Sequence, residues 1–235
     1  MYKVVLIRHG QTQYNKEKIF CGWTDVDLTE KGIGEARFAG QMLKIEGYVF
    51  DIAFCSVLKR AMETISIVLD EMGIRNLPIK YSWRLNERHY GTLQGQKHED
   101  VARICSPEQV QKWRRSFCDR PPQLGEDDPR HPCQDPKYCD MDRKDLPCGE
   151  SLEDTIRRVM PYWNDEIVPA IKSGKRVIVS ASGNSLRALV KHLENISDND
   201  IVGLEIPNAT PLVYELDVDL KFVNKYYINS SSLKS

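Results

Sequence analysis

The fold of this chain is decided by Val4-Val5-Leu6-Ile7-Arg8-His9-Gly10, in which four apolar residues are followed directly by a cation, a histidine and a glycine. An unbroken apolar run of this length predicts a strand that is buried on both faces of a sheet. Ligands of open α/β sheets bind at the carboxyl ends of the strands. A guanidinium matches the geometry of a phosphate, a glycine allows a close backbone approach, and a neutral imidazole can attack phosphorus. The stretch therefore predicts a phosphate site with His9 as the nucleophile.

A second stretch of the same form lies near the other end of the chain. Residues 177–181 form a mainly apolar run that is followed by Ser182, Gly183 and Asn184. This run also predicts a buried strand that ends in a glycine turn. In the first stretch a histidine, His9, precedes the glycine, whereas in this stretch a serine, Ser182, stands before the glycine.

The length of 235 residues allows one large α/β domain or two small ones, and the composition shows no break strong enough to divide the chain. We interpret it as a single domain over residues 1–235, with an irregular insertion over the site at 120–149 and a short polar tail at 228–235. The insertion contains six prolines and many charges. Long loops of this kind are usually lids or binding segments, or else they are disordered.

The charge balance gives no sign of a nucleic-acid or membrane partner. The formal net charge is −1 with 29% charged residues, so an anion site must come from local arginine clusters. No stretch approaches the ~20 apolar residues of a membrane span, and the N-terminus lacks the basic and apolar regions of a signal peptide. The seven cysteines, an odd number without a C-x-x-C pair, favour reduced thiols in a cytoplasmic protein.

Three cysteines of the insertion and a nearby histidine could also be interpreted as metal ligands. They are Cys133, Cys139, Cys148 and His131. Their spacing is irregular and does not resemble that of structural zinc sites. No metal is therefore predicted.

Apolar periodicity predicts alternating strands and helices along most of the chain. Strands are predicted at residues 4–7, 51–55, 177–180 and 212–216. Helices are predicted from the N-cap Thr29 to Gly47, over 58–72, after Ser106, after Ser151 and over 185–195. The helix after Ser151 is expected to bend or restart near Pro161. This alternation indicates an α/β fold with three layers, α/β/α, around a mostly parallel central sheet.

Several charged groups could converge on the edge where the first strand ends. Arg60 lies at the opening of a helix, where free N–H groups suit an anion, although a solvated surface arginine is the alternative. Glu87, next to Arg88, could move a proton if it is partly desolvated, although an ordinary salt bridge is the alternative. Arg114 and Arg115 could clamp a carboxylate or phosphate, or form an exposed charged face.

Taken in order, these segments resemble the cofactor-dependent phosphoglycerate mutases of the histidine phosphatase superfamily. The segments that carry the resemblance are residues 6–15, 20–25, 56–61, 83–91, 113–117, 161–163 and 183–189. Arg8-His9-Gly10 alone marks only the superfamily. The run Trp83-Arg-Leu-Asn-Glu-Arg-His-Tyr-Gly91 points more specifically to the mutases and to the related bisphosphoglycerate mutases. The resemblance covers nearly the whole chain and implies a phosphoglycerate mutase-like form of the three-layer fold.

The resemblance implies the chemistry at His9, which would become a phosphohistidine. Arg8 and Arg60 would bind the phosphoryl oxygens and keep the imidazole neutral. Glu87 would move a proton to and from the substrate hydroxyl. Ser182 stands where the family has a second histidine that donates to the phosphoryl group in flight. A serine is a shorter and uncharged donor, and the loss of one such donor typically costs about 10²–10³ in rate.

The resemblance also implies the residues that hold the phosphate, the carboxylate and a second phosphate of the substrate. These predicted binding residues are Asn15, Cys21, Gly22, Arg88, His89, Tyr90, His98, Arg114, Arg115, Gly183 and Asn184. Cys21 and Gly22 would offer backbone amides, and His89 would act mainly by its position. His98 departs from the family, which usually has a lysine or arginine there. The implied primer is 2,3-bisphosphoglycerate, and no metal is implied. Because relatives are often dimers, a homodimer is also expected.

The implied function is a phosphoglycerate mutase that interconverts 3- and 2-phosphoglycerate in glycolysis, with turnover reduced by Ser182. The chain ends soon after Tyr227, whereas the family continues into a basic tail that helps to close the site. A missing lid would admit water and favour hydrolysis of the phosphohistidine. Two alternatives stay open: a bisphosphoglycerate mutase or phosphatase, and a catalytically weakened relative that binds phosphate.

Overall fold

The computed structural model describes residues 1–229, and the end of the predicted tail, residues 230–235, lies outside the described residues. At its centre is a six-stranded sheet with the order β3-β2-β4-β1-β5-β6. The strands are β1 (Tyr2–Arg8), β2 (Ile52–Cys55), β3 (Ile79–Tyr81), β4 (Val177–Ala181), β5 (Leu212–Leu216) and β6 (Phe222–Tyr227). Strands β3, β2, β4 and β1 are parallel, and β5 is antiparallel to both β1 and β6. The predicted mostly parallel sheet is confirmed.

Strand β1 lies inside the sheet because both of its faces are apolar. Val4 and Leu6 belong to one hydrophobic core, whereas Val5 and Ile7 belong to the other. Alternate residues of a strand face opposite sides of a sheet, so an unbroken apolar run fills both cores. The prediction of a strand covered on both faces is confirmed.

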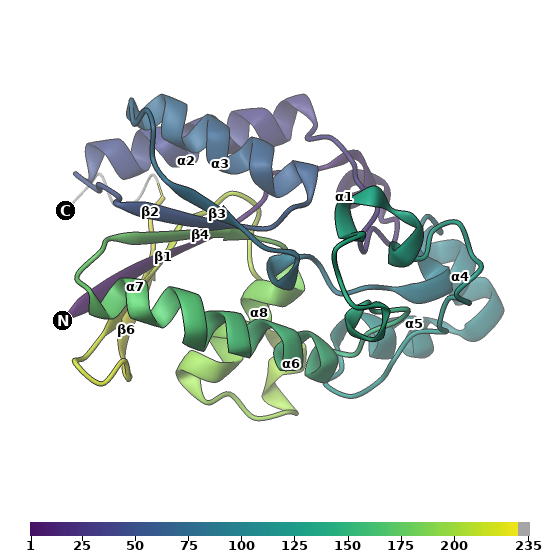
Figure 1. Ribbon diagram of the computed structural model, residues 1–235. Coiled ribbons are helices and arrows are strands. Elements are labelled where there is room, and N and C mark those ends of the chain that lie inside the picture. Colours follow the sequence, from purple (N-terminus) through teal and green to yellow (C-terminus); the bar gives the residue numbers. More distant parts are fainter. Residues whose placement is uncertain (230–235) are drawn as a thin grey trace.

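Helices on both faces of the sheet give the predicted three layers (Figure 1). The face that Val5 and Ile7 fill is covered by α2 (Glu30–Ile45) and α3 (Lys59–Met72). The other face is covered by α6 (Leu152–Tyr162), α7 (Val168–Lys172) and α8 (Gly183–Glu194). Beyond the carboxyl ends of the strands lie α1 (Gln13–Glu17), α4 (His98–Cys105) and α5 (Pro107–Arg115).

The structure departs from the sequence expectations at the edges of the sheet and around one proline. Strands β3 and β6 are not predicted, because they lie at the two edges of the sheet and most of their residues are exposed or only half-buried. Helix α4 is not predicted either, since Val101 is its single buried residue. Helix α6 contains Pro161 and passes at Trp163 into a π turn, so the expected break lies two residues further along the chain.

The segment 120–149 is largely irregular and is hydrogen-bonded to the rest of the fold. It contains three short 3₁₀ turns. Its two ends meet where Leu124 N donates to the Cys148 carbonyl at 2.8 Å. In its middle, the Tyr138 hydroxyl accepts a hydrogen bond from Asn86 Nδ2 at 3.0 Å. The insertion therefore contacts the segment that precedes Glu87.

None of the seven cysteines is paired in a disulfide. Across residues 1–229, we find no helix with the length and apolar character needed to cross a membrane. In the same part of the chain, no group of three or more histidine, cysteine, aspartate or glutamate side chains is arranged to hold a metal ion.

Candidate active site

The predicted nucleophile and Ser182 lie at the carboxyl ends of two neighbouring parallel strands. Strand β1 ends at Arg8, which is paired with Ala181 at the end of β4. His9 N donates to the Ala181 carbonyl at 3.2 Å, so His9 and Ser182 leave the sheet at the same edge. This placement follows from the two apolar runs alone, because the ends of adjacent parallel strands meet at one edge.

The imidazole of His9 has one nitrogen engaged and one available for attack. Its Nδ1 lies 2.8 Å from the Gly10 carbonyl oxygen. A carbonyl only accepts, so Nδ1 carries the proton of the neutral ring and Nε2 keeps its lone pair. Burial, followed by the charges of Arg60 and Arg8, lowers the pKa of His9 well below its usual value of 6.5. Burial is thus the larger cause that favours the neutral ring, and the two arginines add to it.

The glycine after His9 is required by packing against a helix. A Cβ at Gly10 would collide with the carbonyl oxygen of Gly32, and a Cβ at Gly32 would collide with the backbone of Gln11. The sequence predicts that a ligand approaches the backbone closely at Gly10. In the structure, the first turn of α2 makes this close approach.

Arg8 and Arg60 are each held by backbone carbonyls, with donors left over. Arg8 Nη1 donates to the Ile206 carbonyl at 2.8 Å. Arg60 donates to the Thr24 carbonyl at 2.9 Å and to the Gly22 carbonyl at 2.8 Å. The buried Nε atom of each arginine finds no hydrogen-bond partner among the described residues. Because an unpaired buried donor is unfavourable, an anion that accepts from both would be stabilised here.

Glu87 is a buried carboxylate that is held by neutral donors. Its Oε1 accepts from Arg88 N at 2.8 Å, and from the backbone and side-chain nitrogens of Asn184 at 3.1 and 2.7 Å. Burial raises the pKa of Glu87, but Arg60, these hydrogen bonds and Arg8 together hold that pKa below its usual value. Glu87 is thus ionised at neutral pH, and its direct partners are amides, so the ordinary salt bridge is not its role.

A cavity of about 290 Å³ opens beside these groups. Its lining carries five cations against two carboxylates and therefore favours anions. The lining residues are Arg8, Tyr14, Asn15, Lys18, Ile19, Phe20, Cys21, Glu87, Tyr90, His98, Arg114, Arg115, Gly183, Asn184, Arg187, Glu205, Ile206 and Asn208. Ten of them are predicted site residues. His9, Arg60 and Ser182 are buried next to this lining and are not part of it.

The arginines of α5 and the segment 87–90 form a second cationic region. Arg88 is fully buried and donates to the Arg114 carbonyl and, at 3.4 Å, to the Tyr90 hydroxyl. Its Nε and Nη1 atoms lack partners within residues 1–229. Arg115 forms an ion pair with Glu205. This region therefore has unpaired donors that an anionic group could use.

Sequence reasoning missed two cations of the cavity, Arg187 and Lys18. Arg187 donates to Asn184 Oδ1 at 2.7 Å and to the Arg115 carbonyl at 3.0 Å. It lies three residues after Asn184 on α8, and this spacing places both on one helix face, so the sequence contained a usable signal. Lys18 ends α1 in a left-handed conformation, and no pattern in the sequence points it at the cavity.

His98 lines the cavity as a neutral ring. Its edge packs on Phe20, with ring centroids 4.4 Å apart. Burial, followed by the charges of Arg114 and Lys18, lowers the pKa of His98 to about 4. His98 therefore does not replace the positive charge that relatives usually have at this position, whereas Lys18 brings a positive charge to the same cavity.

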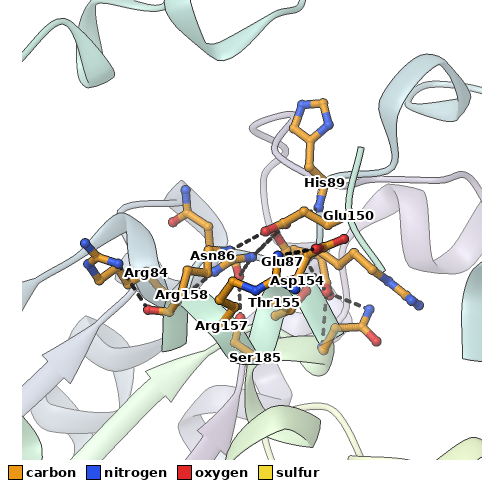
Figure 2. A network of polar contacts seen from close by, with 12 residues as sticks. Arg84, Asn86, Glu87, His89, Glu150, Asp154, Thr155, Arg157, Arg158 and Ser185 are labelled. Carbon is orange, nitrogen blue, oxygen red and sulfur yellow. Dashed lines mark hydrogen bonds and ion pairs between the residues drawn. The ribbon is translucent and has the colours of Figure 1, made fainter. Parts of the chain in front are cut away.

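His89 does not line the cavity. Figure 2 shows its ring pointing away from Glu87. His89 N donates to Glu150 Oε2 at 2.8 Å, and its Nδ1 accepts from Gly91 N at 3.1 Å. The ring lies 5.8 Å from that of Trp23. The residue contributes to the packing beneath the segment that carries Glu87.

Comparisons with known proteins identify the family of this chain and proteins of the same fold. The family model described as Histidine phosphatase superfamily (branch 1) matches residues 4–132 and 126–229. A solved α-ribazole phosphatase from Shigella flexneri is 21% identical, with 97% of this chain and 96% of that chain covered and a TM-score of 0.69. A mycobacterial glucosyl-3-phosphoglycerate phosphatase with bound VO3 is 22% identical, with 97% of each chain covered and a TM-score of 0.72. Bacillus stearothermophilus YhfR is 24% identical, with 94% of each chain covered and a TM-score of 0.70. The likeness to these structures shows a shared fold, and the family match shows that this chain belongs to the histidine phosphatase superfamily (branch 1).

Proposed function

We propose that this chain transfers phosphoryl groups through a phosphohistidine at His9, with small phosphorylated carboxylic acids such as the phosphoglycerates as substrates. One observation carries the proposal. A neutral histidine with a free Nε2 is buried beside Arg8 and Arg60, whose Nε atoms lack partners in the described part of the chain. Phosphoryl oxygens would accept from these donors and place phosphorus next to Nε2.

The distribution of cations supports a substrate with two anionic ends. Arg8 belongs to the sheet edge, whereas Arg114 and Arg115 come from the last turn of α5 and Lys18 from the turn after α1. A phosphate at His9 would bind Arg8, and the other cations remain for a carboxylate or a second phosphate of the substrate. The donors therefore fit 2,3-bisphosphoglycerate, which when bound would supply the phosphoryl group that primes the enzyme.

The residues present suffice for phosphoryl transfer with its proton balanced. His9 Nε2 forms a bond to phosphorus while the ester P–O bond breaks, and the guanidinium groups stabilise the charge on the phosphoryl oxygens. The leaving oxygen takes its proton from Glu87, which has taken up that proton from solvent as the substrate binds. That carboxylate is ionised in the free site, but a bound phosphate adds negative charge beside it and favours its protonated form. The same residue can then accept a proton from the next acceptor.

The fate of the phosphohistidine distinguishes two candidate functions. Transfer to another hydroxyl of the glycerate would make a phosphoglycerate mutase, a candidate supported by the run Trp83–Gly91 and by the second cationic region. Transfer to water would make a bisphosphoglycerate phosphatase or a related phosphomonoesterase. This second candidate is supported by the phosphatase names of the solved structures above and by Ser182, which cannot carry the charge of an imidazolium.

One experiment tests the proposal and separates its two forms. The protein is incubated with 2,3-bisphosphoglycerate and, separately, with 3-phosphoglycerate plus that primer, and the products are followed by phosphorus NMR. We expect an acid-labile phosphohistidine at His9, followed by 2-phosphoglycerate if the protein is a mutase or by inorganic phosphate if it is a phosphatase. The absence of phosphohistidine and of both products would contradict the proposal and leave a phosphate-binding relative.

The lowered pKa of His9 predicts that its phosphorylation tolerates acid. An imidazole with the usual pKa of about 6.5 would lose about tenfold of its neutral form between pH 7.5 and pH 5.5. Because burial and two arginines place the pKa of His9 well below that value, its neutral form persists over this range. The initial rate of phosphohistidine formation from acetyl phosphate, which needs no proton donor, should therefore be nearly constant from pH 7.5 to 5.5. A tenfold fall would show that His9 titrates normally.

A further inference from the structure

A buried ion pair that the proposed chemistry does not use lies behind Glu87 (Figure 2). Arg158 Nε donates to Glu150 Oε1 at 2.7 Å and Arg158 Nη2 donates to Glu150 Oε2 at 3.0 Å. The two side chains are only 7% and 5% exposed. Taking two charges out of water is unfavourable unless their remaining hydrogen-bonding groups are also used. The partners of those remaining groups therefore indicate what the pair is for.

Apart from Glu150, the acceptors that Arg158 contacts are backbone carbonyls of one segment, which is the segment that carries Glu87. Arg158 Nη1 donates to the Arg84 carbonyl at 2.7 Å. Arg158 Nη2 donates to the carbonyls of Asn86 and Glu87, each at 3.0 Å. A planar guanidinium can hold three carbonyls and a carboxylate in one fixed arrangement, which a lysine cannot do.

Glu150 holds the other side of the same segment. Its Oε2 accepts from His89 N at 2.8 Å, and its own N–H donates to the His89 carbonyl at 2.8 Å. The Glu87 carbonyl also accepts from Trp23 Nε1 at 2.6 Å. The backbone is thus fixed directly before, at and after Glu87, although none of these contacts reaches its carboxylate.

A fixed backbone matters here because the carboxylate of Glu87 is itself bound to backbone. Its Oε1 accepts from the N–H of Arg88, which lies between the carbonyl held by Arg158 and the amide held by Glu150. A proton donor works only within about 2.6–3.2 Å of the accepting atom. A misplacement of about 1 Å can cost about 10²-fold in rate.

We propose that Arg158 and Glu150 are positioning residues that hold Glu87 at the leaving oxygen. They touch no substrate and act through the backbone of residues 84–89. This inference rests on the proposed function, because it requires Glu87 to protonate the leaving group.

The test compares two phosphoryl donors that differ in their need for a proton. The glycerate leaving group of 2,3-bisphosphoglycerate departs as an alkoxide unless it is protonated, whereas acetyl phosphate releases a stable carboxylate. Single-turnover rates of His9 phosphorylation are measured with both donors. Arg158→Met should slow the reaction with 2,3-bisphosphoglycerate by about 10²-fold, and that with acetyl phosphate by less than about threefold. Glu87→Gln should show the same split, and the double variant should lose no more than Glu87→Gln alone.

Two further variants keep the test decisive if Arg158→Met does not fold. Arg158→Lys keeps the charge but not the fork of donors, and Glu150→Gln keeps the shape but not the charge, so each should show a smaller split in the same direction. Arg176→Ala is the matched control, since its ion pair with Asp51 is exposed and lies at the amino ends of β2 and β4. It should leave both rates unchanged.

The outcomes distinguish the inference from the proposed function. Equal losses with both donors would show a merely structural role and overturn the inference, as would the absence of any loss. Failure of the unaltered protein to form phosphohistidine from either donor would instead overturn the proposed function, and the inference with it. A loss confined to 2,3-bisphosphoglycerate supports the positioning role.

Discussion

Replacing His9 with alanine is expected to abolish phosphoenzyme formation and to lower turnover of phosphoglycerates by about 10⁴-fold or more, the scale on which loss of a nucleophile acts. The reason is chemical, because no other described histidine combines a free ring nitrogen with the sheet edge and the unpaired donors of Arg8 and Arg60. The phosphorylated protein is detected as an acid-labile, alkali-stable adduct after incubation with 2,3-bisphosphoglycerate.

The control for this variant is His192→Ala, which removes an exposed histidine of α8 and should leave phosphoenzyme formation unchanged. Binding of inorganic phosphate, measured by calorimetry, should persist in His9→Ala because its arginines remain. A His9→Ala protein that still forms the adduct would place the nucleophile elsewhere. One that loses both the adduct and phosphate binding would point to damage of the whole site.

The elements that could be predicted from the sequence are those whose burial on both faces leaves an unbroken apolar run. Strands β1 and β4 are of this kind, and the edge at which they end carries His9 and Ser182. Each of these side chains comes directly after its strand in the sequence, so the sequence alone places it at a strand end. The pairing of β1 with β4 then brings the two strand ends together. The same reasoning explains the prediction of Arg60, which belongs to the first turn of the helix after β2.

What could not be predicted depends on contacts between distant segments. Lys18 reaches the cavity through a left-handed turn, and an isolated lysine gives no periodic signal. Glu150 lies just before α6 and Arg158 lies within it, where charged residues are ordinary, yet their partners lie more than sixty residues away, at residues 84–89. The orientation of His89 is of the same kind, because it depends on hydrogen bonds with Glu150 and Gly91 that the sequence does not show.

Introducing a histidine at Ser182 is expected to raise turnover of phosphoglycerates by about 10²–10³, the usual value of one donor to a transferring phosphoryl group. Ser182 is fully buried, and its hydroxyl finds no partner among residues 1–229. The adjoining Gly183 lies against Arg8 and Glu87, since a Cβ there would be 3.4 Å from Arg8 Nε and 3.6 Å from Glu87 Oε2. Residue 182 also leaves the sheet at the same edge as His9, because β4 ends beside β1 and His9 N donates to the Ala181 carbonyl.

The measurement is the rate of 3- to 2-phosphoglycerate conversion and of phosphate release, with 2,3-bisphosphoglycerate present, in the unaltered protein and in Ser182→His. Ser182→Asn is the matched comparison, because it lengthens the donor without allowing a positive charge, and it should give a smaller gain. Backbone strain does not affect these variants, since Ser182 has an extended conformation that any residue adopts.

The outcomes distinguish three cases. If the unaltered protein already turns over at about 1–10³ s⁻¹, another group supplies the donor and the serine does not reduce activity. If Ser182→His raises mutase turnover but not phosphate release, the chain is a mutase slowed at one position. A rise in phosphate release alone would instead favour the phosphatase.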